Sequence, residues 1–112
     1  MAERNSALMS GIPELLVLRL LAGREMYGYE IARSVKLISR EALVIGEGVL
    51  YPALHAMESR RLLRARSTRV DGRTRIYYGL TARGRARLAR LSEDWRRMSR
   101  GVAAILGEGS LG

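Results

Sequence analysis

The chain has 112 residues, enough for one domain, and its 47% hydrophobic and 28% charged content is typical of a folded globular protein rather than a disordered one. The absence of cysteine excludes disulfides, thiolate metal sites and cysteine nucleophiles. No apolar run approaches the ~20 residues that span a bilayer, and residues 1–7 are too polar for a signal peptide, so we expect a cytoplasmic protein.

The positive charge is concentrated in one part of the chain. The formal net charge is +9, from 20 basic and 11 acidic residues. Residues 1–59 carry 6 basic and 7 acidic groups, residues 60–100 carry 14 arginines and 3 acids, and residues 101–112 add one acid. Such asymmetry indicates a polyanionic partner. The alternative is a solvated, arginine-biased surface, because 19 of the 20 basic residues are Arg.

The N-terminal part of the sequence predicts an arm followed by a helix. Residues 1–10 have the character of a loose arm with one basic residue, Arg4. A helix is expected over residues 13–22, because Pro13 suits a first turn, where its missing N–H has no helical partner in any case, and Gly23 suits a stop. Leucines cover most of this helix, which predicts burial on more than one side: Leu15, Leu16, Leu18, Leu20 and Leu21.

A second helix is expected over residues 28–39. Its core stripe falls at i, i+4 and i+7: Ile31, Val35 and Ile38. The short, largely β-branched run of residues 43–45 predicts a single strand, and Gly46 and Gly48 mark the turn into the next helix.

The third helix is expected over residues 49–61. Leu50, Leu54 and Met57 repeat at i, i+4 and i+7 and predict its buried face. The outward face is then formed by a small, partly aromatic set: Gly48, Tyr51, Pro52, His55 and Ser59. Proline in the helix is tolerable only if the helix starts near residue 48 or 49.

A hairpin and a long helix complete the pattern. Residues 63–69 and 75–80 predict two strands joined by a turn at residues 70–73, where Asp-Gly is a strong hairpin signal. Thr81 predicts the cap of a final helix reaching Leu106. That helix would be about 39 Å long, too long for a domain of this size to cover.

The final helix has a narrow apolar seam spaced 3, 4, 3, 4, 3, which is the a/d pattern of a coiled coil: Leu88, Leu91, Trp95, Met98, Val102 and Ile105. Its other faces are strongly polar and rich in arginine. We expect this seam to be a homodimer interface; the alternative is that it packs on its own protomer.

The predicted fold is mainly α with a small β-hairpin: a winged helix-turn-helix plus a long C-terminal dimerisation helix. A helix with an exposed polar face followed by an arginine-tipped hairpin is the layout of a winged-helix DNA reader. The expected division is a winged-helix DNA-binding domain over residues 1–80, and a dimerisation helix and tail over residues 81–112.

The chain resembles the PadR family of bacterial transcriptional regulators in three motifs in the right order. Residues 26–31 (MYGYEI) are similar to the family's start of helix two, residues 47–54 (EGVLYPAL) to its recognition-helix signature, and residues 75–81 (RIYYGLT) to its second wing strand, with Gly84 at the familiar offset. The single long C-terminal helix resembles the short subgroup of the family. Arg61 stands where the family often has a glycine, and Val49 where it often has a threonine.

The resemblance implies that the third helix enters the major groove of DNA. Gly48, Tyr51 and His55 then face the DNA: the Tyr51 ring would pack on the sugar-phosphate edge, and His55 would reach a base edge or a phosphate. The alternatives are that Tyr51 is a half-buried brace for the helix and that His55 is an exposed bystander. A lone histidine with no companion ligands is a poor metal or catalytic candidate, so no metal site and no cofactor are expected.

Further DNA contacts are expected from basic and helix-start residues, with plain solvated surface as the alternative for each. Three arginines flank the Asp-Gly turn and suit the minor groove or its phosphates: Arg69, Arg73 and Arg75. Tyr27 and Gly28 would offer backbone N–H groups and a hydroxyl to a phosphate at the start of the second helix. Lys36 and Arg40 would add charge at its far end.

Trp95 is the only tryptophan and lies in the middle of the seam. In a dimer, two indoles in an apolar gap would sandwich a planar aromatic effector, in keeping with the phenolic compounds or drugs to which some PadR-like regulators respond. The alternative is that Trp95 simply packs the interface.

The function predicted from the sequence is that of a sequence-specific DNA-binding transcriptional regulator, a repressor relieved by a small-molecule effector. It would bind a pseudo-palindromic operator as a homodimer. No constellation of catalytic residues supports an enzyme. The alternative is a basic, amphipathic dimer that associates with membrane surfaces or binds nucleic acid non-specifically; an RNA-binding module lacks its aromatic sheet signature here.

Overall fold

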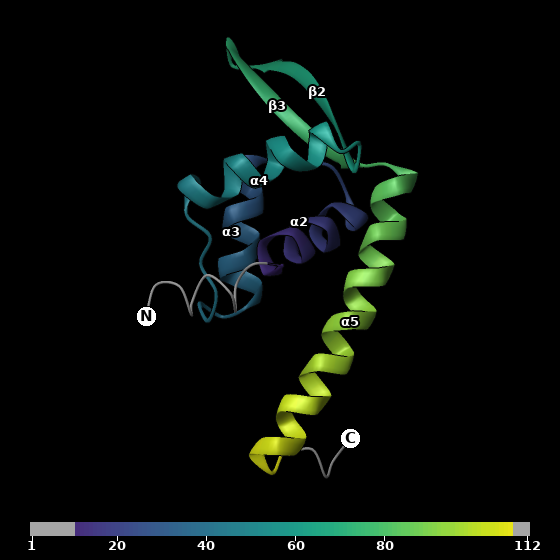
Figure 1. Cartoon of the computed structure of the whole chain (residues 1–112). Helices are drawn as coiled ribbons and strands as arrows, with labels where there is room; N and C mark the ends of the chain where they lie inside the picture. The colour runs from purple at the N-terminus through teal and green to yellow at the C-terminus, as the bar shows by residue number, and fades with distance from the viewer. Residues whose placement is uncertain (1–10, 109–112) are drawn as a thin grey trace.

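The computed structural model describes residues 11–108 of the protein. The expected N-terminal arm with Arg4 lies outside the described residues, as do residues 109–112. Over the described range, the chain forms four helices and one three-stranded antiparallel sheet (Figure 1). The predicted fold class, mainly helical with a β-hairpin wing and one long C-terminal helix, is confirmed.

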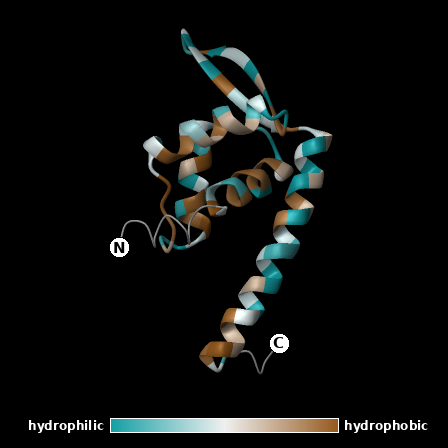
Figure 2. Ribbon diagram, viewed as in Figure 1, coloured by the Kyte–Doolittle hydropathy of each residue, from teal (hydrophilic) through white to brown (hydrophobic). Residues whose placement is uncertain are grey.

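Helix α2 (Ile12–Gly23) lies at the centre of the fold, packed against α3, α4 and α5. Pro13 is in its first turn and Gly23 ends it, as predicted. Val17 and Leu18 are fully buried and Leu21 is nearly so, so this helix is covered on several sides. Figure 2 shows the apolar residues gathered on α2 and on the elements that face it.

Helix α3 (Gly28–Ile38) is preceded by a strand that the sequence did not reveal. The two-residue strand β1 (Met26–Tyr27) pairs antiparallel with β3 through Met26↔Tyr78 and Tyr27↔Tyr77. Within α3, Ile31 and Val35 are buried as predicted, but Ile38 is 72% exposed.

The predicted strand at residues 43–45 is wrong. This segment is a loop between α3 and α4, in which Ile45 is buried and Val44 is exposed. Leu43 and Ile45 anchor this loop on the core, and the described sheet, which consists of β1, β3 and β2, does not include the segment.

Helix α4 (Glu47–Ser59) begins two residues earlier than predicted and buries Leu50, Leu54 and Met57, as predicted. It ends in a left-handed residue: Arg61 has φ +63°, while the N–H of Leu62 donates to the carbonyl of Met57 at 2.9 Å. This is a Schellman-type end with arginine at the position that usually takes glycine. Arg61, which stands where the family often has glycine, therefore adopts a strained left-handed conformation, and the helix keeps this type of cap.

The wing is a hairpin of β2 (Leu63–Val70) and β3 (Arg73–Leu80), both longer than predicted. The turn consists of Asp71 and Gly72, with φ of +51° and +77°, and positive φ at both positions is the geometry of the tight hairpin turn for which Asp-Gly is suited.

Helix α5 (Ala82–Leu106) is capped as predicted: the Thr81 hydroxyl accepts the Gly84 N–H at 3.0 Å. Its N-terminal half contacts the body of the protein, and its C-terminal half extends away from it (Figure 1). None of the helices in the described range is long and apolar enough to cross a membrane.

The predicted seam of α5 divides into two parts. Leu88 and Leu91 pack against the protomer's own core, which is the alternative that the sequence left open for the seam. Beyond them the seam is exposed: Met98 is 56%, Val102 52% and Ile105 87% exposed. Only this outer part is left free to meet a second protomer.

Candidate nucleic-acid interface

The face of α4 opposite the core is exposed over its full length, as the helical periodicity predicted. Its members are all solvent-accessible: Gly48, Tyr51, Pro52, His55 and Ser59. The helix positions them because Leu50, Leu54 and Met57 hold the other face against α2 and the sheet. The buried face therefore holds the backbone of α4 against the core and leaves the opposite face accessible.

Tyr51 packs as a brace for the helix, one of the two roles that the sequence left open, and its contact with DNA stays a prediction. It is 37% exposed, yet its ring lies directly over Gly28 at the start of α3. A Cβ atom at Gly28 would lie only 2.5 Å from the Tyr51 hydroxyl oxygen and 2.8 Å from the ring. Tyr51 thus braces α4 against α3 and still presents part of its ring to a partner.

The packing of the protomer does not require glycine at position 48. A Cβ there would meet no heavy atom within 4 Å, and Gly48 is not among the positive-φ glycines, Gly72 and Gly107. Glycine within a helix nevertheless costs roughly 0.5–1 kcal/mol relative to alanine. A bare backbone in the first turn of an exposed helix is what close approach of another molecule requires.

The wing arginines lie on two faces of the hairpin. In the register of β2 and β3, Val70 pairs with Arg73 and Thr68 with Arg75, whereas Arg69 pairs with Thr74. Directly paired residues share a face, so Arg73 and Arg75 point to one side and Arg69 to the other. The structure therefore separates the three arginines that the sequence grouped at one tip.

Arg75 does not extend into solvent at the tip. Its guanidinium carbon lies 4.1 Å from the centre of the Tyr27 ring, and Tyr27 in turn contacts Tyr77 edge to face at 5.5 Å. A hydrogen bond with Tyr77 raises the pKa of Arg75, with smaller electrostatic contributions from both tyrosines. Stacking on Tyr27 therefore places this cation beside the start of α3.

At the tip itself, Arg69 is tied to the turn and Arg73 is exposed. The Arg69 Nη2 donates to the Gly72 carbonyl at 2.7 Å, so part of its donor capacity is used internally. Arg73 is the first residue of β3 and directly follows the turn.

The start of α3 differs in detail from the expectation. The Tyr27 N–H donates to the Glu30 carboxylate at 3.2 Å, and Gly28 is buried beneath Tyr51. The expected donation of the Tyr27 N–H to a phosphate is therefore displaced by an internal contact. Glycine at position 28 is explained by the space that Tyr51 occupies.

Lys36 and Arg40 are exposed but are not brought to the wing. They lie in the last turn of α3 and just beyond it, at the end that points away from the hairpin (Figure 1). Nine residues of helix separate Lys36 from Tyr27, a rise of roughly 14 Å. A DNA contact from these two residues remains a prediction, and the geometry places it at the far edge of the surface.

Arg64 and Arg66 of the first wing strand are weaker candidates from the sequence, and the structure pairs Arg66 with Glu25, which the sequence did not indicate. The Arg66 guanidinium lies 5.1 Å from the centre of the Tyr77 ring and donates to the Glu25 carboxylate at 2.9 Å. In the register, Arg66 pairs with Tyr77 and Arg64 with Gly79, so the position of Arg66 beside a tyrosine can be recognised only once the register is known. Within the described part of the chain, no group of three potential metal-ligating side chains is found.

A helical core that carries an exposed helix and an arginine-rich hairpin at the same end defines a winged helix-turn-helix DNA-binding protein. The chain belongs to the PadR-like family of transcriptional regulators, whose family model matches residues 17–90.

Relatives of known fold and name agree with this assignment. The chain is 34% identical over 93 residues to the transcriptional regulator Rv3488 of Mycobacterium tuberculosis, covering 83% of this chain and 81% of that protein. A transcriptional regulator from Clostridium thermocellum superposes with a TM-score of 0.82 at 25% identity, covering 88% and 97% of the two chains. A PadR family transcription regulator from Clostridium difficile gives 0.74 at 32% identity, covering 86% and 99%.

Proposed function

We propose that this PadR-family regulator is a sequence-specific repressor that binds a pseudo-palindromic operator as a homodimer in the cytoplasm. The observation that carries the proposal is the exposed face of α4, with Gly48, Tyr51 and His55, at the same end of the fold as the arginine-rich hairpin. In this arrangement α4 lies in the major groove, with Tyr51 and His55 toward the DNA. The wing of each protomer lies beside its own α4, with Arg73 exposed and Arg75 stacked on Tyr27.

The proposal is tested by removing the wing charges. Arg73→Ala combined with Arg75→Ala should weaken operator binding by at least tenfold, because each loses a charge-assisted contact to DNA. The control is Arg96→Ala combined with Arg97→Ala, the same loss of charge on exposed positions of α5 where both arginines pair with neighbouring acids. Equal affinities of the two double variants would contradict a specific role for the wing.

The proposed dimer uses the outer seam of α5. Met98, Val102 and Ile105 leave an apolar stripe exposed on a helix that is otherwise polar, and a second copy of the same stripe would cover it. Val102→Asp should convert the dimer to a monomer in sedimentation, while the core residues keep the fold intact. A protein that is already monomeric at micromolar concentration would contradict this assembly.

Relief of repression by a planar aromatic effector is the finer part of the proposal. Trp95 lines an apolar cavity of about 240 Å³ together with Ile12, Leu15, Leu16 and Leu43. A planar compound bound there would contact α2 and α5 at once and so alter the angle between the wings of a dimer, which lowers DNA affinity by linkage. Quenching of Trp95 fluorescence by planar phenols tests this, and absence of quenching by any of them would contradict it.

A basic dimer on a membrane surface is the rival function. Its supporting observation is the arginine-rich, amphipathic α5 with its exposed apolar stripe. Flotation with anionic vesicles in the absence of DNA separates the two: a DNA-binding regulator stays in the lower fractions, whereas a surface-bound protein floats.

A further inference from the structure

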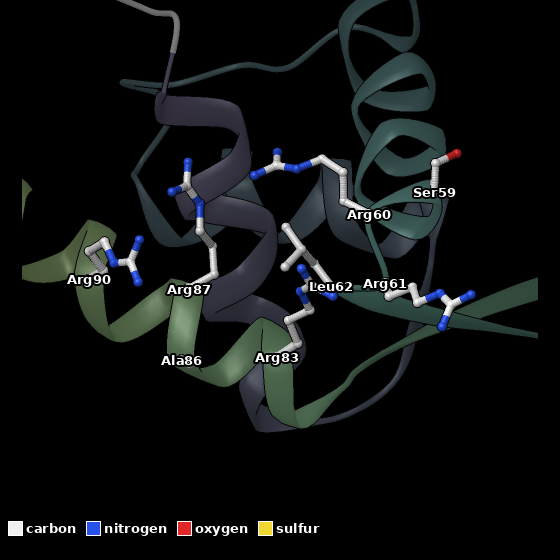
Figure 3. A pocket seen from close by; sticks show the side chains of 8 residues that line it. All are labelled: Ser59, Arg60, Arg61, Leu62, Arg83, Ala86, Arg87 and Arg90. Atoms are coloured by element: carbon white, nitrogen blue, oxygen red, sulfur yellow. The ribbon is translucent and has the colours of Figure 1, made fainter.

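A second basic site lies apart from the exposed face of α4. A cavity of about 480 Å³ lies between the C-terminal end of α4 and the first half of α5 (Figure 3). Five arginines line it: Arg60, Arg61, Arg83, Arg87 and Arg90. The three on α5 are spaced i, i+4 and i+7, so they share one face of that helix. We call this site the arginine pocket.

The arginine pocket holds more positive charge than the fold neutralises. The Glu14 carboxylate of α2 accepts from Arg87 Nε at 2.9 Å and pairs with Arg60 Nη1 at 3.4 Å. The bond to Glu14 raises the pKa of Arg87, which keeps this group charged. Among the described residues, Arg83 and Arg90 form no salt bridge, so the Glu14 carboxylate, with a weaker influence of Asp94 on Arg87, leaves the pocket with excess positive charge.

The two walls of the pocket are fixed to each other. The Thr81 N–H donates to the Leu62 carbonyl at 3.2 Å, and the Thr81 hydroxyl lies 2.7 Å from the Arg61 carbonyl oxygen, to which it donates. Gly84 allows α5 to approach the same segment closely, since a Cβ there would lie 2.1 Å from the Leu62 carbonyl oxygen. The spacing of the two backbone segments that carry these arginines is therefore set before anything binds.

The side chains are arranged to receive a ligand. In Figure 3, Arg60, Arg83 and Arg87 project into the space between α4 and α5, Arg90 lies at the outer end, and Arg61 points away from the others. Like charges gathered around a hollow repel each other, and a bound anion relieves that repulsion. Guanidinium groups present planar pairs of donors that match phosphate and carboxylate oxygens.

We propose that the arginine pocket binds a small multivalent anion that carries phosphate or carboxylate groups. Its volume falls within the range of about 300–1,000 Å³ usual for small-ligand sites. The site is partly open and large enough to admit a compact anion. The anion would compete with Glu14 for Arg60 and Arg87 and so join the end of α4 to α5.

That bridge has a regulatory consequence, and this part rests on the proposed function. Arg60 directly follows α4, the proposed recognition helix, and α5 is the proposed dimer helix. An anion held between them would reduce the positive charge beside the end of α4 and so lower operator affinity by linkage. Binding of the anion itself does not depend on DNA.

The test uses the full chain and inorganic pyrophosphate in titration calorimetry, at roughly 0.15 M salt, where the Debye length is about 8 Å. We expect saturable binding that Arg83→Gln combined with Arg90→Gln weakens at least tenfold. The matched control is Arg85→Gln combined with Arg100→Gln, the same charge loss on exposed positions of α5 outside the pocket. This control should change the affinity less than threefold.

Three results would overturn the proposal. These are no saturable pyrophosphate binding, equal weakening by both double variants, or weakening of DNA binding alone by Arg83→Gln with Arg90→Gln. The last result would make the arginines part of the DNA surface. Citrate in a parallel titration separates carboxylate from phosphate recognition, and a short duplex added to the pyrophosphate complex shows whether the two ligands compete. Because the first measurement contains no DNA, its failure is distinguishable from failure of the proposed regulator function.

Discussion

Gly48→Ala should stabilise the protein and weaken its binding to DNA. The added methyl group meets no heavy atom within 4 Å in the protomer. Replacing helical glycine by alanine gains roughly 0.5–1 kcal/mol, with the lower figure appropriate to a first turn. On DNA, the same methyl group would hold the backbone off the duplex. The loss of one or two hydrogen bonds at about 1 kcal/mol each weakens binding by roughly 5- to 30-fold.

The assay pairs denaturant unfolding with fluorescence anisotropy on the operator, both at the same protomer concentration. Gly101→Ala is the control, because it also lies in open space within a helix but far from α4. It should give a similar gain in stability, about 1 kcal/mol, with unchanged DNA affinity. If Gly48→Ala binds the operator as tightly as the wild type does, Gly48 is not at the interface and the reasoning from its bare backbone is refuted.

Three further predictions concern the frame of the site. Gly84→Ala should destabilise the fold by about 2–3 kcal/mol in denaturant unfolding despite its better helix propensity, because its Cβ would lie 2.1 Å from a backbone oxygen; an unchanged midpoint would contradict the close approach. Arg61→Gly should raise the free energy of unfolding by about 0.5–1 kcal/mol by relieving a positive φ, whereas Arg60→Gly at φ −85° should lower it; equal effects would contradict the left-handed cap. Burial raises the pKa of Tyr78 above its ordinary value of 10.0, so its neutral form is favoured in the folded state; stability should be fully present below pH 10 and fall as the pH rises beyond it. Tyr78→Phe should lessen that fall, and an identical pH dependence in both proteins would show that another group titrates.

Local patterns in the sequence were sufficient to predict the helices and the hairpin. The buried face of α4 follows from residues spaced at i, i+4 and i+7, and the turn from Asp71-Gly72, which tolerate positive φ. The loop at residues 43–45 was mistaken for a strand because β-branched residues that anchor a loop have the same composition as a short strand. Strand β1 escaped notice for the opposite reason: its two residues pair with β3, some fifty positions away, and carry no local pattern.

The features that the sequence did not predict depend on contacts between residues far apart in the chain. Apolar spacing along α5 shows that one face is covered, but not that Leu88 and Leu91 are covered by their own protomer. The wing arginines were recognisable by type and position. Their separation onto two faces, and the stacking of Arg75 on Tyr27, depend on the register of β2 and β3 and on the placement of β1.

The measurement that tests the central claim most directly is fluorescence anisotropy with DNA from upstream of the protein's own gene, against scrambled DNA of equal length, at two salt concentrations. The account predicts tight, sequence-selective binding that weakens by roughly 10³ or more between low and moderate salt, because several phosphate contacts release counterions. Weak and equal binding to both DNAs would contradict it, and would leave a basic dimer whose partner is not a specific operator.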